Sequence, residues 1–137
     1  MARLKLYPHN PKIKRALSGC VDFVIKDGLN YLIPEWKRFV KNVDEDDGSI
    51  IYEYLNDVDT RDIINKILPY LADNEKIKIE IELQEYDAIF VSKTFETEEC
   101  LWGTENEIAK GWTRQENFYY YKAPQHLIDR EPEIEKI

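Results

Sequence analysis

The chain has 137 residues, of which 43% are apolar and 34% are charged, and its formal net charge is −8. This length and the 12% aromatic content predict one domain with its own core and exclude a disordered chain. No apolar run approaches the roughly 20 residues that span a bilayer, and the start at Met1 lacks the apolar stretch of a signal peptide. We therefore expect a cytoplasmic protein with no membrane partner.

The charges are divided unevenly along the chain. Residues 1–43 carry nine Lys/Arg and three Asp/Glu, whereas residues 44–137 carry ten Lys/Arg and 24 Asp/Glu. The excess of acidic groups repels nucleic acid and speeds encounter with basic proteins. The basic cluster of Lys12, Lys14 and Arg15 is too small to predict a nucleic-acid partner.

The N-terminal part is predicted to contain two strands and one long helix. Polar and apolar residues alternate over 3–7, and β-branched and aromatic residues dominate 20–25, which is typical of strands. The basic segment 11–18 between them is expected to form one helical turn. Apolar residues then repeat at spacings of three and four over 29–43, which predicts a helix with one apolar face. Pro34 is expected in the first turn of the main part of this helix, where a missing N–H does little harm.

An acidic loop, a strand and a second helix are predicted next. Residues 44–48 are expected to form a solvated loop, and the apolar and aromatic run 50–55 predicts a strand. Asp59 suits the N-cap of the second helix, because its carboxylate can accept the free N–H groups of the first turn. Pro69 is expected to bend or end that helix.

The clearest strand pattern follows the second helix. Apolar and charged residues alternate over 75–83, which predicts a half-buried strand with one wet face. A turn at 85–87 leads into the apolar run 88–95, so we expect the two runs to pair as an antiparallel hairpin.

The last elements are a short helix and a strand. Thr104 and Glu107 have the spacing of a capping box, and Gly111 suits the C-terminal end of a helix between them. The aromatic run 117–122 predicts a final strand that ends before Pro124.

These elements predict an α+β fold. We expect a single domain over residues 1–123, in which two principal helices pack on one face of a largely antiparallel sheet. An acidic C-terminal tail over residues 124–137 is expected to be loosely attached.

No pattern in the chain predicts a metal, a cofactor or a catalytic centre. Cys20 and Cys100 are expected to be buried free thiols, and neither is at paired zinc-ligand spacing with the other or with His9 and His126. An EF-hand register that aligns Gly48 with the invariant glycine places no carboxylate at the first and last ligand positions. The chain also lacks a phosphate-binding glycine loop. We therefore expect no cofactor and favour a protein that is not an enzyme.

Two groups of residues are candidates for binding a partner. The acidic loop offers four successive carboxylates, although a solvated turn or a cation site outside the EF-hand pattern are alternatives. Late in the chain, Trp and Tyr residues lie among glutamates, as in an interface anchor with an acidic rim, although the rings could instead complete the core or line a ligand pocket. The candidate partner-binding residues are Asp44, Glu45, Asp46, Asp47, Glu98, Glu99, Trp102, Glu105, Trp112, Tyr119 and Tyr121.

The hypothesis that best fits the charge is a small acidic protein that binds and neutralises a basic protein partner. Immunity proteins and antitoxins that block nuclease toxins act in this way, by electrostatic steering followed by docking of anchors. One alternative is an accessory or scaffold domain of a larger assembly, including a homo-oligomer. The other is a small-ligand-binding protein or an enzyme with an aromatic pocket.

Overall fold

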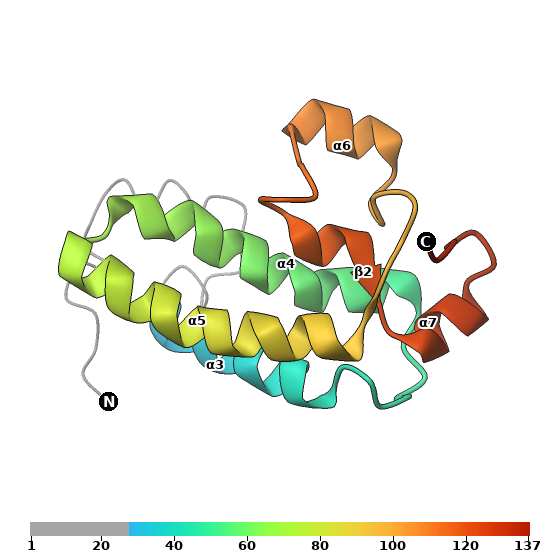
Figure 1. Ribbon diagram of the computed structural model, residues 1–137, viewed down its shortest axis with the longest axis horizontal. Coiled ribbons are helices and arrows are strands. Elements are labelled where there is room, and N and C mark those ends of the chain that lie inside the picture. Colours follow the sequence, from blue (N-terminus) through green and yellow to red (C-terminus); the bar gives the residue numbers. More distant parts are fainter. Residues whose placement is uncertain (1–27) are drawn as a thin grey trace.

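The computed structural model describes residues 28–137, and Figure 1 shows a helical body with a C-terminal segment folded back on it. Three long helices form the body: α3 (Leu29–Asn42), α4 (Ile51–Ile67) and α5 (Asp73–Lys93). A short 3₁₀ turn, η1 (Leu68–Tyr70), joins α4 to α5. The strands expected over 3–7 and 20–25 and the turn over 11–18 lie outside the described residues.

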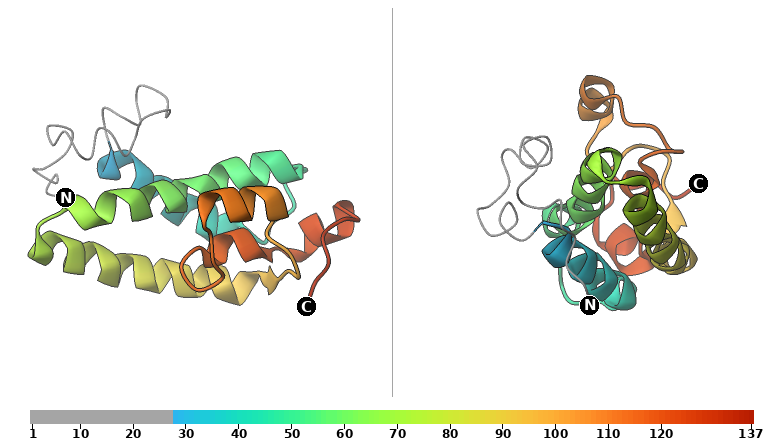
Figure 2. Two further views of the ribbon diagram at one scale, coloured as in Figure 1. Left: turned by 90° about the horizontal axis from the view of Figure 1, so that it is seen from above. Right: turned by 90° about the vertical axis from the view of Figure 1, so that its left-hand side faces the viewer.

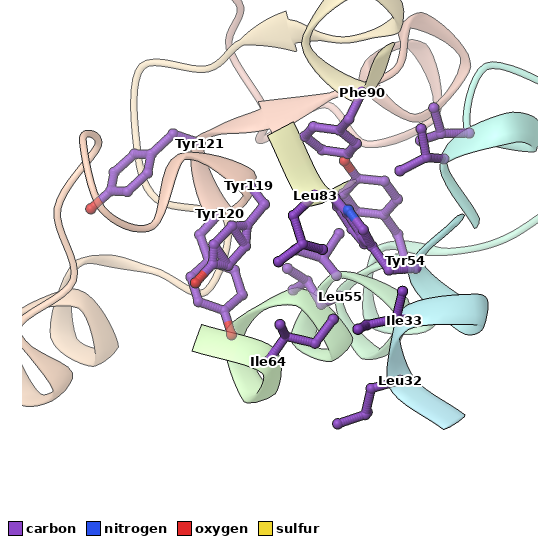
Figure 3. Close-up of a cluster of buried hydrophobic side chains, with 14 of the residues drawn as sticks. Leu32, Ile33, Tyr54, Leu55, Ile64, Leu83, Phe90, Tyr119, Tyr120 and Tyr121 are labelled. Carbon is purple, nitrogen blue, oxygen red and sulfur yellow. The ribbon is translucent and has the colours of Figure 1, made fainter. Parts of the chain in front are cut away.

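The three long helices pack around a shared apolar core. Viewed along the bundle in Figure 2, they form the corners of a triangle, and α3 packs against both α4 and α5. Each helix buries one apolar stripe, and Figure 3 shows part of the resulting cluster. The side chains with at most 2% exposure include Leu29, Leu32, Trp36, Val40, Leu55, Val58, Ile64, Ile67, Leu83 and Phe90.

The C-terminal third closes the remaining side of this core. It contains α6 (Thr104–Lys110), the 3₁₀ turn η2 (Phe118–Tyr121) and α7 (Gln125–Arg130). Strand β1 (Phe95–Glu96) pairs antiparallel with β2 (Lys122–Ala123), with Phe95 opposite Ala123 and Glu96 opposite Lys122. This short ladder holds η2 against the bundle, where the Phe118 ring lies 6.1 Å from that of Phe90 on α5.

The predicted α+β fold class is wrong. The described residues form five α-helices, two 3₁₀ turns and a single sheet of two very short strands. No helix in this part of the chain is long and apolar enough to cross a membrane. The helix predicted over 29–43 is confirmed by α3, with Pro34 inside it, and the short helix predicted before Gly111 is confirmed by α6.

The prediction of a hairpin over 75–95 is wrong, because the spacing of the apolar residues fits both the two-residue period of a strand and the 3.6-residue period of a helix. Ile79 and Leu83 are four residues apart and both are buried, as on one face of a helix. Ile77 and Ile81 share the opposite face and are 57% and 64% exposed. The segment has no Gly or Pro and is rich in Glu and Lys, so helix propensity resolves the ambiguity in favour of α5.

The other two predicted strands are wrong as well. Residues 50–55 form the start of α4, where the Ile50 backbone N–H donates to the Glu53 carboxylate at 3.1 Å. Asp59 therefore lies inside α4 and is not an N-cap. The aromatic run 117–122 forms η2 and contributes only Lys122 to the sheet.

The segment over 124–137, predicted to be a loosely attached tail, lies against the body of the protein. Leu127 on α7 is 1% exposed and Ile134 is 8% exposed. The Ile137 N–H donates to the Glu96 carbonyl at 3.0 Å, and the Glu98 N–H donates to the Glu135 carbonyl at 2.8 Å. These contacts extend the ladder begun by β1 and β2.

Asp87 on α5 lies at the centre of a partly buried polar network. Arg61 on α4 donates to its two carboxylate oxygens from Nε and Nη2 at 3.0 and 2.9 Å, and Trp36 on α3 donates from Nε1 at 3.0 Å. Arg61 also donates to Asn65, which donates to the Tyr119 hydroxyl at 3.1 Å. One carboxylate thus connects all three long helices, and through Arg61 it reaches η2.

Replacing Arg61 by Ala should lower the free energy of unfolding by about 2 kcal/mol, because the partly buried Asp87 then loses its counter-ion. Lys76→Ala is the matched control, since it breaks only the exposed pair with Glu80 at 3.9 Å and should change the free energy by less than about 0.5 kcal/mol. Urea unfolding followed by circular dichroism measures both. Equal effects of the two substitutions would show that the buried pair does not stabilise the bundle.

Candidate functional site

A pocket of about 230 Å³ opens where the end of α3, the loop before α4 and α7 meet. We call it the acidic pocket. Its floor contains the rings of Phe39 and Tyr54, together with Val43 and Leu127. Its rim contains four carboxylates, from Glu35, Glu45, Asp47 and Asp57.

The acidic loop owes its shape to hydrogen bonds from its own backbone. Asp46 accepts from the Gly48 N–H at 3.0 Å, and Asp47 accepts from the Ser49 N–H at 2.9 Å. Such Asx turns reverse the chain within a few residues, and Gly48 adopts a φ of 81°, which favours glycine. Arg130 on α7 then fixes the loop, donating to the Asp46 carboxylate at 2.6 Å and to the Ser49 carbonyl at 2.8 Å.

The carboxylates of this region differ in the groups that contact them and in the direction in which their pKa is shifted. The hydrogen bond from Arg130 is the main cause that lowers the pKa of Asp46, and hydrogen bonds from Ser49 lower the pKa of Asp47. Burial raises the pKa of Asp57, and the nearby Asp47, Glu35 and Glu53 raise it further. Among residues 28–137, the side chains of Glu45 and Asp57 have no ion-pair partner, whereas Glu35 pairs with Arg38.

This arrangement suits the side chain of an arginine or a lysine. The aliphatic stem of such a residue can lie on the aromatic floor, while its charged head reaches the carboxylates of the rim. Arg38 and His126 are the basic groups that line the pocket, and Arg38 is already paired with Glu35. An entering cation would therefore find carboxylates without counter-ions in Glu45, Asp47 and Asp57.

Three side chains near the loop could hold a metal ion. One ligand atom each from Asp46, Asp47 and His126 lies within 4.8 Å of the other two. Asp46 is already paired with Arg130, whose guanidinium would compete with a cation for the same oxygen. The donor set therefore fits a salt-bridged turn better than a dedicated metal centre.

The second predicted acidic group lies at a different hollow. Glu98 and Glu99 line a pocket of about 280 Å³ together with Glu133, Glu135 and the buried Cys100. The hydrogen bond with Glu135 and the charge of that residue raise the pKa of Glu98. Burial also raises the pKa of Cys100, which is a free thiol, as predicted, and shows no sign of activation. Cys20 and His9 lie outside the described residues.

The predicted aromatic anchors contribute mainly to the core. Tyr119 and Tyr121 are 0% and 3% exposed, and Trp102 and Trp112 are half-buried. In Figure 3, Tyr119 lies in the main cluster, while Tyr121 points away from it, and its hydroxyl donates to Glu107 on α6. Neither tyrosine ring lies on the surface.

Tyrosine and tryptophan side chains of the C-terminal third donate hydrogen bonds to carboxylates on α4. No pattern in the sequence predicts these pairs. The Tyr119 hydroxyl donates to Asp62 at 2.6 Å, and the Tyr120 hydroxyl donates to Asp59 at 2.6 Å. Trp102 Nε1 also donates to Asp59, at 3.2 Å. Some of the carboxylates therefore accept hydrogen bonds from side chains of the core. Glu105, another predicted site residue, is exposed on α6.

The structure adds site residues that sequence reasoning missed. Asp44, Glu45, Asp46 and Asp47 lie together in one loop, as expected, with Asp44 paired to Lys93 at 3.4 Å. Glu35 and Asp57 join the pocket from α3 and α4, and His126 joins it from α7. No local signal marked them, because their proximity depends on how the helices and the C-terminal segment pack.

In comparisons with known proteins, no family model, no curated protein and no solved structure matches the chain. The class that the described part defines is a helical bundle with an acidic surface pocket.

Replacing Asp57 by Asn should raise the melting temperature at about pH 7 but not at about pH 3, where the carboxyl is protonated. The pKa of Asp57 is raised in the folded state, so folding is favoured by the protonated form, and stability falls as pH rises through that pKa. Asp47→Asn should have the opposite sign at neutral pH, because the pKa of Asp47 is lowered. Thermal melts of both variants against pH measure this difference, and the same response from both would contradict it.

Proposed function

We propose that this protein binds a basic protein in the cytoplasm and neutralises it, in the manner of immunity proteins and antitoxins that block nuclease toxins. The observation that carries the proposal is the acidic pocket, in which the carboxylates of Glu45 and Asp57 have no counter-ion within the described residues and surround an aromatic floor. A pocket of this kind recognises a Lys or Arg side chain.

The charge of the whole described part supports the same proposal. Residues 28–137 carry 25 Asp/Glu and 13 Lys/Arg. A field of this sign steers a basic partner toward the surface and raises the association rate. The free carboxylates of the pocket then pair with a cationic group of the partner, which would occupy a basic active site as a stoichiometric plug.

The alternative of an aromatic ligand pocket has little support from the geometry. The rings that suggested it belong to the core, and the hydroxyls of Tyr119, Tyr120 and Tyr121 already donate to carboxylates. The acidic pocket has the better claim because it contains charged groups that lack ion-pair partners within residues 28–137.

The proposal is tested with three baits in a pull-down from lysate of the native host at about 50 mM and about 500 mM salt, where exposed charges are partly and largely screened. The baits are the unaltered protein, a pocket variant (Glu45→Gln, Asp47→Asn, Asp57→Asn) and a control variant (Asp73→Asn, Glu80→Gln, Glu116→Gln). The control removes the same number of exposed charges away from the pocket. A basic prey should bind the unaltered protein and the control at low salt and be lost with the pocket variant.

The purified prey then gives the association rate. The pocket variant should associate at least about tenfold more slowly at low salt, because steering and the ion pairs are both removed. A prey retained equally by all three baits would assign the binding to another surface. Absence of any basic prey at low salt would contradict the proposed function.

A further inference from the structure

Residues 131–137, which we call the strap, lie antiparallel to the segment that continues β1. Thr97 lies opposite Lys136, with one backbone hydrogen bond on each side of this pair. Ile134 is the one buried side chain of the strap, and at its start the Glu131 carboxylate accepts the first N–H of α4 at 3.0 Å. Because so few contacts hold the strap, it can open without unfolding the helical body.

The register of this ladder places two carboxylates opposite each other. Glu98 and Glu135 form the next pair along from Thr97 and Lys136, and the Glu98 N–H donates to the Glu135 carbonyl at 2.8 Å. Side chains of directly opposite residues point to the same face, with Cβ atoms about 5 Å apart. Like charges in this position destabilise a ladder.

No cation offsets this repulsion within residues 28–137. The basic side chains of the neighbouring segments have other contacts: Lys136 donates to Gln125, and Lys122 lies opposite Glu96 in the other ladder. Arg114 donates to the backbone carbonyl of Glu98 and lies over the Tyr121 ring. The hollow behind the strap is lined by four glutamates, none of which forms an ion pair in this part of the chain: Glu98, Glu99, Glu133 and Glu135.

We propose that the strap is a pH-sensitive latch, which is closed when one of the two opposed carboxyls is protonated and loosened when both are ionised. A protonated carboxyl donates a hydrogen bond to the carboxylate opposite, whereas two carboxylates only repel. The hydrogen bond with Glu135 and the charge of that residue raise the pKa of Glu98 in the closed form. A group whose pKa is raised by closure favours the closed form at low pH, and this stabilisation is lost as pH rises through the raised pKa.

Opening of the latch uncovers a thiol. Cys100 is 5% exposed and lines the hollow together with Ile134. A closed strap separates this thiol from solutes, and an open strap gives them access. The latch thus links the pH of the solution to the accessibility of Cys100.

Hydrogen exchange of the full chain, followed by NMR at about pH 4 and about pH 7.5, tests the proposal. The N–H groups of Glu98 and Ile137 donate across the ladder to the strap or from it, so their protection factors should be about two- to fivefold lower at the higher pH. The Thr97 N–H donates to the Tyr121 carbonyl, away from the strap, and should keep its protection. Unchanged protection of Glu98 and Ile137, or a fall that Thr97 shares in full, overturns the latch.

A charge-removing variant tests whether the opposed pair is the sensor. Glu135→Gln keeps the size of the side chain, and its amide can donate to Glu98, so protection at pH 7.5 should rise to its value at pH 4. Glu105→Gln is the matched control, because Glu105 is exposed on α6 and lies outside the ladder, and it should leave the pH dependence unchanged. The same pH dependence in Glu135→Gln as in the unaltered protein overturns the role of the pair.

The rate at which an aromatic disulfide reagent modifies Cys100 at pH 7.5 reports the opening independently. All variants carry Cys20→Ser, so Cys100 is the only thiol. Glu135→Gln should lower the rate about two- to fivefold, and Ile134→Ala should raise it at least about fivefold, because it removes the buried side chain of the strap. Circular dichroism checks that each variant keeps its helices. Equal rates in the three proteins overturn the inference that the strap covers Cys100.

Discussion

The ion pair between Arg61 and Asp87 is the interaction on which the rest of the structure depends. A carboxylate that is largely removed from water is stabilised by a counter-ion, and here the counter-ion and a further donor come from two other helices. This requirement helps to fix the position of α5 along α3 and α4, because hydrogen bonds depend steeply on distance and direction. The network then continues through Asn65 to Tyr119, so it also decides where η2 enters the bundle.

Acidic residues play two separate roles in this molecule, and the difference lies in their partners. Asp62 and Asp59 accept hydrogen bonds from buried tyrosines, so donors inside the protein replace part of their hydration. Glu45 and Asp57 face the acidic pocket without such donors among the described residues. Net charge counts both groups equally, so by itself it does not tell which carboxylates already have donors inside the protein.

The sequence correctly predicts those elements whose apolar spacing fits only one kind of secondary structure. The stripe over 29–43 repeats at three and four, which only a helix satisfies, and the structure contains that helix. Over 75–83 the apolar residues satisfy a strand and a helix alike, and the choice depends on propensity and on packing against α3 and α4. The acidic loop was predictable because its residues are consecutive, whereas Asp57 and His126 enter the pocket only through tertiary packing.

The position of the C-terminal segment has a consequence for the order in which the protein forms during synthesis. Tyr119 and Tyr120 fill the space beside α4, and Arg130 fixes the loop that borders the acidic pocket. Until these residues leave the ribosome, the earlier helices lack part of their core and the loop lacks its clamp. The described part of the chain thus reaches its final shape only after Arg130 has emerged, and the pocket becomes complete at the same moment as the core.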